Sequence, residues 1–505
     1  MPPVRPVSRA PDIAGKSRSR CKGCGHHQES PELVRDSEQR SVPASRLAAH
    51  SAILGLLSIA TATITAITQI PDYVEPAGVL FGPAVTMTAG LMIPIALRLR
   101  QDLWSVLLVE NILITGLVYW LLLDLLQSAY PMELVNHAHV AMAFGAVGLF
   151  ACGIWLGAAG RGWRLPNAVR SAANLTLSRK VLVSAIGLSF CLGMISFAVP
   201  SGFNPIVMVE GLGAPRWSAP WSRGAFGGVD AVFDHLQYFG YILPGLCVLL
   251  AHRIGWLRPN TLFSLLLATV MMLFLSQAGG RRIIGVTIGA GLFTWLVLQR
   301  RLKPKVIFSS MIGLFGLLAF LQEMLRYRNA GFAAWLGGER PELDVSHLHV
   351  DDNFLRLSQI IMIFPDLHDY VYYKPLYHAL MLPIPRFLWA SKPTDPGFDL
   401  PELIGSSTGA SLSSSMVGEL YASFGLVAVF LGGFVLGRLA GMWNKCLHLA
   451  GGDSRALMFG LGSMAMFAGL RSVQALVQMS YIVLAWIVVA AIIRARLASR
   501  QQSIR

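Results

Sequence analysis

Segments that combine arginine with tryptophan, glycine and proline carry the clearest chemical signal in this chain. The segment GAPRWSAPWSRGAFGG (213–228) alternates Arg216 and Arg223 with Trp217 and Trp221, and it is too rich in Gly, Pro and Ser for a regular helix. Guanidinium groups bind phosphate oxygens through paired hydrogen bonds, and the flat face of an indole packs well on a sugar ring. The pattern therefore favours a site for a ligand that carries both phosphate and sugar.

Four further places in the chain offer cations beside glycine, proline or aromatic residues. They are Arg281 and Arg282 in LSQAGGRRIIG (275–285), Arg326 and Arg328, Arg386 and Lys392 in PIPRFLWASKPTDP (383–396), and Arg471. If they converge at one membrane surface, these groups suit the head group of a lipid-linked diphosphate. The alternative is that each arginine separately contacts a phospholipid head group, which any single arginine can do.

The composition indicates that membrane helices must position these segments. Of the 505 residues, 54% are hydrophobic and only 13% are charged, and the mean hydropathy is +0.56. Soluble domains carry about 25% charged residues, so half that share cannot cover a soluble surface. We therefore predict a membrane protein and exclude a chain of soluble domains.

A helix that crosses the hydrocarbon core needs about 20 mostly apolar residues. About twelve stretches approach this length, and 456–470 is marginal. They lie at 49–70, 79–97, 104–127, 138–158, 181–199, 236–251, 261–278, 284–299, 306–323, 425–441, 456–470 and 474–493. We expect an all-α, polytopic membrane protein of about twelve transmembrane helices.

The net charge of +14, from 41 Lys and Arg against 27 Asp and Glu, follows mainly from this topology. With both termini in the cytoplasm, most Lys and Arg fall in cytoplasmic segments, as the positive-inside rule requires. They are spread between the spans instead of forming a basic patch with aromatic residues, so no nucleic acid partner is expected. The cations left on the outer side oppose the rule, and we regard them as functional candidates.

Five regions follow from the topology. They are a disordered cytoplasmic tail without a signal peptide (1–48), helices one to nine with an outer loop at 200–235 (49–323), a large outer loop (324–424), the last three helices (425–493) and a cytoplasmic tail (494–505). The large outer loop is too long for a plain connector. Apolar residues at helical spacing in 353–365 predict an amphipathic helix at the membrane surface.

Two groups of metal-ligand residues give weaker signals. The run CKGCGHH (21–27) places Cys21 and Cys24 before two histidines, which are ligands that zinc prefers, but no second ligand pair accompanies them. The run HLH (347–349) precedes Asp351 and Asp352. A tail and a polar loop are the favoured interpretations, so no metal site is expected.

Two carboxylates interrupt the predicted span 104–127. Glu110 lies near its middle and Asp124 near its outer end. An ionisable group at bilayer depth is a functional candidate by default, and a proton-coupled transporter is one interpretation. The other is that Glu110 is protonated or hydrogen-bonded to a neighbouring span.

Two segments resemble a known family. They are PIPRFLWASKP, which begins at Pro383, and SSSMVGELYASFGLVAVFLGGFVLG (413–437), which contains Glu419 and Tyr421. The chain is similar here to the oligosaccharide repeat-unit polymerases, the Wzy-type O-antigen polymerases, in which a Pro-Arg segment closes the large outer loop and a Gly-Glu-x-Tyr-x-x-Phe-Gly run enters the next span. The direct likeness covers about a tenth of the chain, and the span number and loop position agree along most of it.

The resemblance implies a GT-C-like membrane glycosyltransferase at the periplasmic face of the bacterial inner membrane. Such an enzyme joins repeat units carried on undecaprenyl diphosphate, which serve as donor and acceptor, and it needs no cofactor; a chain-length regulator protein is a further partner. It implies catalytic roles for Glu419, Arg281 and Arg223. The expected substrate-binding residues are Arg216, Trp217, Trp221, Arg282, Arg326, Arg328, Arg386, Lys392, Tyr421 and Arg471.

The chemistry agrees with this reading but leaves alternatives open. Arginine donors can stabilise the charge that builds on a departing diphosphate, and Glu419 could act as general base or instead orient an arginine through a salt bridge. Asp352, Asp230 and Asp234 are the reserve bases. A flippase of lipid-linked sugar and an O-antigen ligase, for which His378 lies near Pro383, remain the alternative functions.

Overall fold

The computed structural model describes residues 49–502, apart from residues 161, 223–232, 278–279, 300, 328, 340–346, 385–387, 390, 394, 406–411 and 450–451. The chain divides by its contacts into Met1–Ser41 and Val42–Arg505, and every described residue belongs to the second unit. The regular elements of the described part are all helical, and helices account for 74% of the described residues. The predicted all-α class is confirmed.

Ten helical segments of the described part are long and apolar enough to cross a membrane, which supports a multi-pass membrane protein. They are α2 (Ala49–Thr68), α3 (Phe81–Gln101), the continuous run α4 (Val109–Leu117), η2 (Val118–Leu122) and α5 (Leu123–Leu126), α6 (His137–Ala159), α8 (Arg179–Ala198), α13 (Pro259–Ser276), α14 (Arg281–Leu298), α15 (Pro304–Tyr327), α20 (Ser415–Trp443) continued by η4 (Asn444–His448), and α22 (Val473–Gln502).

Two of the twelve predicted spans form shorter helices. The stretch 236–251 becomes α11 (Gln237–Tyr241) and α12 (Leu243–Ile254), which meet at Ile242. The stretch 456–470 becomes α21 (Ser454–Gly469), a helix of 16 residues whose side chains are nearly all buried. α21 packs against α14 and α22, so its hydrophobicity reflects a protein environment on every side. The number twelve stays a prediction.

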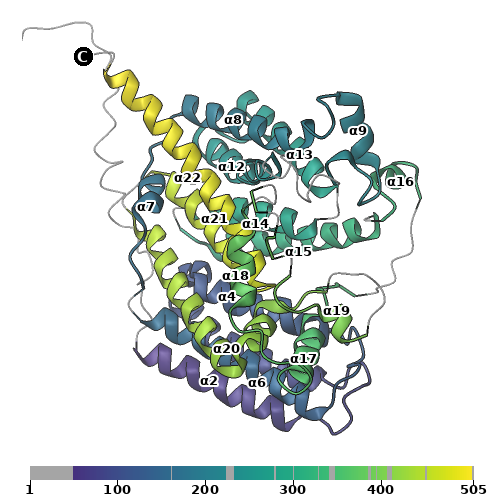
Figure 1. Cartoon of the computed structure of the whole chain (residues 1–505). Helices are drawn as coiled ribbons and strands as arrows, with labels where there is room; N and C mark the ends of the chain where they lie inside the picture. Colours follow the sequence, from purple (N-terminus) through teal and green to yellow (C-terminus); the bar gives the residue numbers. More distant parts are fainter. Residues whose placement is uncertain are drawn as a thin grey trace, which may run out of the picture. The chain divides into compact units, whose positions relative to one another are not determined.

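Shorter helices occupy the connections. η1 (Leu103–Leu107) and α7 (Asn167–Ala173) lie in two of them, α9 (Pro205–Gly213) and η3 (Pro220–Ser222) in a third, and α16 (Phe332–Leu336), α17 (Asn353–Ile363), α18 (Lys374–Met381) and α19 (Leu400–Leu403) in the longest. Figure 1 shows α16, α17 and α19 at the opposite end of the helices from α7 and the C-terminal end of α22. The helix expected at 353–365 is α17, but it packs between α6 and α20 with most of its side chains buried, instead of lying on a surface.

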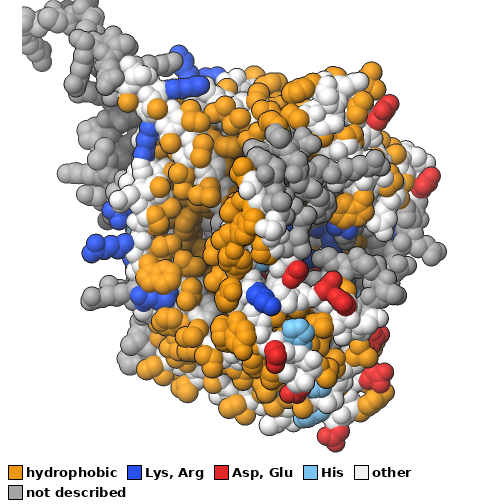
Figure 2. Space-filling view, viewed as in Figure 1, with side chains coloured by type: hydrophobic (Ala, Val, Ile, Leu, Met, Phe, Trp, Pro, Cys, Tyr) orange, Lys and Arg blue, Asp and Glu red, His pale blue; other side chains and the backbone are white. Residues whose placement is uncertain are grey.

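Charged side chains are separated on the visible face. In Figure 2, Lys and Arg gather along one edge, Asp and Glu gather toward the opposite edge, and apolar side chains cover the area between them. Charges at two ends with an apolar band between them are typical of a protein that spans a bilayer.

Glycines set the closest helix packing, which joins α6 to α20. A Cβ atom added at Gly153 or Gly157 of α6, or at Gly433 or Gly437 of α20, would collide with backbone atoms of the other helix. Small residues let membrane helices approach until their backbones touch. This contact fixes the part of α20 that follows Gly425.

α20 is broken where the sequence reads Phe424-Gly425. Phe424 has φ −152° and ψ 31°, and Gly425 has φ 63°, both outside the helical range. A positive φ favours glycine, and a Cβ at Gly425 would lie 2.9 Å from the hydroxyl oxygen of Tyr370. The break separates the segment 415–423, which carries Glu419 and Tyr421, from the part of α20 packed on α6.

Candidate functional site

Three distant parts of the chain meet at one carboxylate. Arg471, between α21 and α22, donates from Nε to Oδ2 of Asp351 over 2.7 Å. Arg281, the first residue of α14, places Nη2 3.7 Å from Oδ1 of the same residue. Arg281 also donates from Nη1 to the carbonyl oxygen of His349 at 3.1 Å. Asp351 therefore holds two of the predicted arginines in one cluster.

Arg282 adds a third guanidinium to this cluster. Its side chain is partly exposed and lies within electrostatic range of Arg471 and Asp351. Within the described part of the chain it forms neither a hydrogen bond nor an ion pair. Arg281, Arg282 and Arg471 all lie within electrostatic range of Asp351. We call these four residues the arginine cluster; within it three cations accompany one carboxylate, and such a balance of charge attracts an anion.

Polar side chains of the α4–α5 run hold the segment that carries Asp351. Gln127 exchanges two hydrogen bonds with the backbone of Leu348, at 3.1 and 2.9 Å. Asp124 accepts from the backbone nitrogen of Val350 at 3.2 Å. Asp124, which the sequence marked as a functional candidate, therefore helps to position Asp351.

Backbone strain is concentrated beside the cluster. Asp351 and Asp352 have φ angles of 67° and 50°, and Ser415, at the start of α20, has 55°. A non-glycine residue in this region costs of order 1 kcal/mol or more, and such residues gather at functional sites. The surrounding hydrogen bonds must hold these conformations in place.

The pH dependence of stability can be worked out for Asp351. Burial alone would raise its pKa, but the charge and hydrogen bond of Arg471 and the charge of Arg281 lower it below its ordinary value. Such a group stabilises the fold above its unfolded-state pKa of about 3.9, and this contribution is lost as the pH falls through the folded-state pKa. We expect Asp351→Asn to lower the unfolding temperature equally at about pH 7 and about pH 5, with the difference shrinking below about pH 4. Thermal unfolding of the purified protein across this range checks the result, and a difference that grows in acid would contradict it.

Glu419 is buried and both of its carboxylate oxygens accept hydrogen bonds. Oε1 accepts from the hydroxyl of Ser414 at 2.8 Å, and Oε2 accepts from the backbone nitrogen of Val473 at 2.7 Å. Val473 begins α22, where free N–H groups and the helix dipole favour a carboxylate. Since Val473 lies two residues after Arg471, Glu419 fixes the turn that presents this arginine. These contacts favour a positioning role, and its role as general base stays a prediction.

Two of the reserve bases lie near the arginine cluster. Asp352 adjoins Asp351, and Asp234 is within electrostatic range of Tyr238 and Tyr241, as Arg282 is. Asp352 lies 3.6 Å from Nδ1 of His349 and 3.7 Å from Nη2 of Arg356. In the described part of the chain no three His, Cys, Asp or Glu side chains are grouped so that they could hold a metal ion. Cys21, Cys24 and Asp230 lie outside the described residues.

Aromatic residues that the sequence analysis did not single out lie beside Arg282. Its side chain is within electrostatic range of Tyr238 and Tyr241. The ring of Tyr238 lies 5.1 Å from those of Tyr241 and Tyr481, and His235 lies 5.9 Å from Tyr481. The hydroxyl of Tyr481 is buried and has no hydrogen-bond partner in the structure. A phenol inside the predicted span 474–493 was the signal that could have marked Tyr481.

Tyr119 approaches the cluster from another side. It lies within electrostatic range of Arg281 and Asp351. It belongs to η2, a π-helical turn between α4 and α5, and such turns occur frequently at functional sites. No residue pattern in the sequence announces this turn.

The tryptophan segment is divided between surface and core. Arg216 stacks over the ring of Trp217 at 4.3 Å, and Trp217 is 65% exposed. Trp221 is instead buried against Phe197 and Phe274, with ring centroids 5.5 Å away in both cases. Only Trp217 of the two is therefore open to a ligand in this structure.

The remaining predicted residues have other partners or are not described. Arg326 pairs with Glu323 of the same helix at 3.3 Å. Lys392 donates to the carbonyl oxygens of residues 382 and 384, just after α18, at 2.8 and 2.9 Å. Tyr421 is buried on α20. Arg223, Arg328 and Arg386 lie outside the described residues.

Glu110 belongs to a buried polar network away from the arginine cluster. Its carboxylate lies 3.2 Å from Nη1 of Arg98 and accepts from the side-chain amide of Asn444 at 2.6 Å. Arg98 also donates to Asn111 at 3.1 Å and stacks over Trp155 at 4.9 Å. Both oxygens of Glu110 have partners, which fits the structural interpretation better than a carrier of protons.

Comparison of the chain with models of protein families, with curated proteins and with solved structures found no match.

Proposed function

We propose that the protein transfers a saccharide from a lipid-linked diphosphate to an acceptor sugar, as an oligosaccharide repeat-unit polymerase does. The observation that carries the proposal is the arginine cluster, in which three guanidinium groups lie within electrostatic range of Asp351 at the ends of membrane helices. A diphosphate needs several such donors, and a lipid carrier places it at this level of a membrane. The motif around Glu419 supports the saccharide half of the assignment.

The three arginines of the cluster have one role in the proposed reaction. An acceptor hydroxyl oxygen forms a bond to the anomeric carbon, the bond from that carbon to the diphosphate oxygen breaks, and its electron pair leaves with the diphosphate. Arg281, Arg282 and Arg471 stabilise this leaving charge, since preorganised donors act most strongly where charge develops. The hydroxyl proton passes to a base, and the assignment of Glu419 to this step rests on the motif alone.

The finer features of the proposal come from the resemblance and the charge pattern. They are a GT-C-like arrangement of about twelve spans, a site on the periplasmic side of the bacterial inner membrane, cytoplasmic termini and a chain-length regulator as partner. This topology places most Lys and Arg in cytoplasmic segments, which supports the orientation, and it assigns the helix ends that carry the arginine cluster to the periplasmic side.

Analysis of lipid-linked and surface glycan in a strain that lacks the protein tests the proposal. We expect single capped repeat units in place of the ladder of chain lengths, with the ladder restored by the intact gene. Ladders that form but are not transferred to their final acceptor would instead indicate a ligase. Untransferred units on the cytoplasmic side would indicate a flippase, and either outcome would overturn the proposal.

A further inference from the structure

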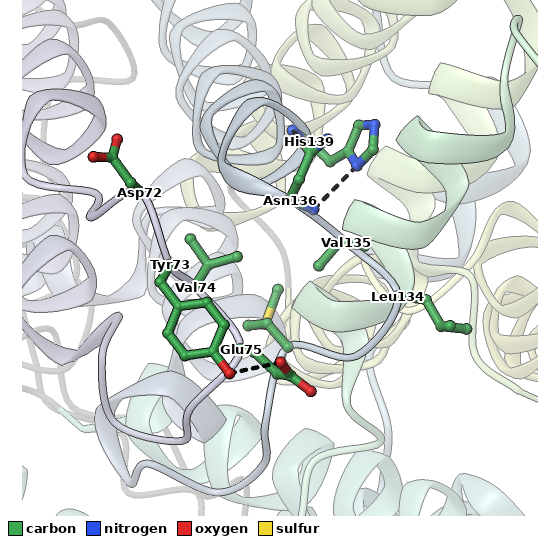
Figure 3. Close-up of a pocket in the computed structure, with 9 residues that line it drawn as sticks. Asp72, Tyr73, Val74, Glu75, Leu134, Val135, Asn136 and His139 are labelled. Atoms are coloured by element: carbon green, nitrogen blue, oxygen red, sulfur yellow. Dashed lines mark hydrogen bonds between the residues drawn. The ribbon is translucent and has the colours of Figure 1, made fainter.

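A separate cavity opens between two connections on the same side as the arginine cluster. It has a volume of about 360 Å³, and its walls are residues 72–75, between α2 and α3, and Met132 and residues 134–136, before α6, together with His139 (Figure 3). This volume falls within the usual range of about 300–1,000 Å³ for sites that bind small molecules. The functional site described above uses none of these residues.

Hydrogen bonds between the walls form the cavity before any ligand arrives. The backbone nitrogen of Met132 donates to the carbonyl oxygen of Glu75 at 2.9 Å, and His137 contacts the carbonyl oxygen of Pro71 at 3.1 Å. Leu134 is 62% exposed at the rim with a φ of 65°, a strained conformation for leucine. A preformed site lowers the entropy lost on binding.

α17 connects this cavity to the arginine cluster. Gln359 donates from Nε2 to the carbonyl oxygen of Glu133 at 3.3 Å, and it also accepts from Arg356 at 2.9 Å. Arg356 in turn pairs with Asp352, which adjoins Asp351. The two sites are therefore joined by one network of polar contacts.

The groups in the cavity combine a donor, an acceptor and an exposed ring. Nδ1 of His139 accepts from the backbone nitrogen of Asn136 at 3.3 Å, so the proton of the neutral imidazole sits on Nε2 and can be donated. Oε2 of Glu75 accepts from the hydroxyl of Tyr73 at 2.8 Å, and its other oxygen is left for a ligand. The ring of Tyr73 is 65% exposed.

The charge of the walls selects the class of ligand. Among the residues that line the cavity, Asp72 and Glu75 are acidic and none is Lys or Arg. Such walls repel phosphate and uronate groups, whereas a carboxylate, an N–H donor and an aromatic face suit the hydroxyls and ring of a sugar. We propose that this cavity binds a neutral or amino sugar of the acceptor or growing chain. The proposal rests on the proposed function and adds a second saccharide site to it.

Binding of lipid-free saccharide to the full-length protein in detergent tests the proposal. The probe is a set of oligosaccharides of about one to three repeat units, released by hydrolysis from the surface polysaccharide of the source cells, and saturation-transfer NMR reports the contact. We expect Tyr73→Ala and Glu75→Gln each to weaken binding about tenfold, as loss of a central contact does. Tyr373→Ala and Glu402→Gln, at an exposed tyrosine and glutamate that do not line the cavity, should bind normally.

The outcomes separate this proposal from the proposed function. Arg282→Ala should keep the binding of lipid-free saccharide, because the probe carries no diphosphate. Unchanged binding in Tyr73→Ala and Glu75→Gln would overturn the saccharide site and leave the transfer reaction standing. Preferential binding of uronate-containing fragments would also overturn it. The two variants can bind about tenfold more weakly than the wild-type protein while the deletion strain still makes normal ladders. In that case the assignment as a polymerase fails and the saccharide site is retained.

Discussion

Arg282→Ala is expected to reduce formation of polymer by at least about a hundredfold, which removes the ladder from a glycan gel. Loss of one preorganised donor to a developing negative charge typically lowers kcat by about 10²–10³. Arg282 is the member of the arginine cluster that forms no hydrogen bond or ion pair with another described residue, so its guanidinium is available to the diphosphate. The measurement is the ladder in a deletion strain that expresses the variant, together with the transfer rate of the purified protein.

Two further variants make the Arg282 result specific. Arg282→Lys keeps the charge but loses the planar, paired donors, so an intermediate rate is expected. Arg253→Ala removes an arginine that pairs with Asp453 at 2.8 Å outside the arginine cluster, and it should leave the ladder unchanged. Equal membrane levels of all three proteins must accompany the comparison. A normal ladder from Arg282→Ala would contradict the role proposed for this residue.

Arg98→Met is expected to destabilise the folded protein by about 3–5 kcal/mol, the usual effect of leaving a buried charge without its partner. Arg98 is 9% exposed and Glu110 is 3% exposed. Removing the guanidinium leaves the Glu110 carboxylate with Asn444 as its remaining partner among the described residues. The measurement is the unfolding temperature of the purified protein in detergent, together with its yield in the membrane.

A second substitution distinguishes an unpaired charge from lost packing. Arg98→Met combined with Glu110→Leu removes both charges, and it should recover much of the lost stability because apolar pairs often replace buried ion pairs without loss. Arg253→Ala, which breaks a partly exposed pair, should change stability by no more than about 1 kcal/mol. A double variant less stable than Arg98→Met alone would show that the pair itself stabilises the fold.

The fold class could be predicted from the sequence because long apolar runs indicate membrane helices directly. Ten of the predicted spans are helices of adequate length. The number of transmembrane helices is harder to predict. α21 is apolar for a different reason, because it is enclosed by other helices of the same protein. Hydropathy does not distinguish contact with lipid from contact with protein, so a run such as 456–470 has no unique interpretation.

Only some residues of the candidate site could be predicted from the sequence. The rule that cations avoid the outer side selected Arg281, Arg282 and Arg471, and the structure brings these three together. Asp351, the carboxylate of the cluster, could not be chosen from among the acidic residues of the long connection. Gln127 and Asp124, more than two hundred residues away, form hydrogen bonds with the backbone of residues 348 and 350 and so position it. Trp221 illustrates the reverse limit: its spacing suggests a ligand platform, yet Phe197 and Phe274 enclose it.

The glycine contacts between α6 and α20 also determine where the molecule can deform. The backbones of α6 and α20 touch directly at Gly153, Gly157, Gly433 and Gly437. Because no side chains separate them there, the two helices cannot slide past each other and must move as one body. α15 is at the other extreme, with only 6% of its apolar stretch buried and its main contacts limited to α14 and α16. A displacement of the helices, such as the proposed lipid-linked substrate would require, therefore meets least resistance at α15 and most at the α6–α20 pair.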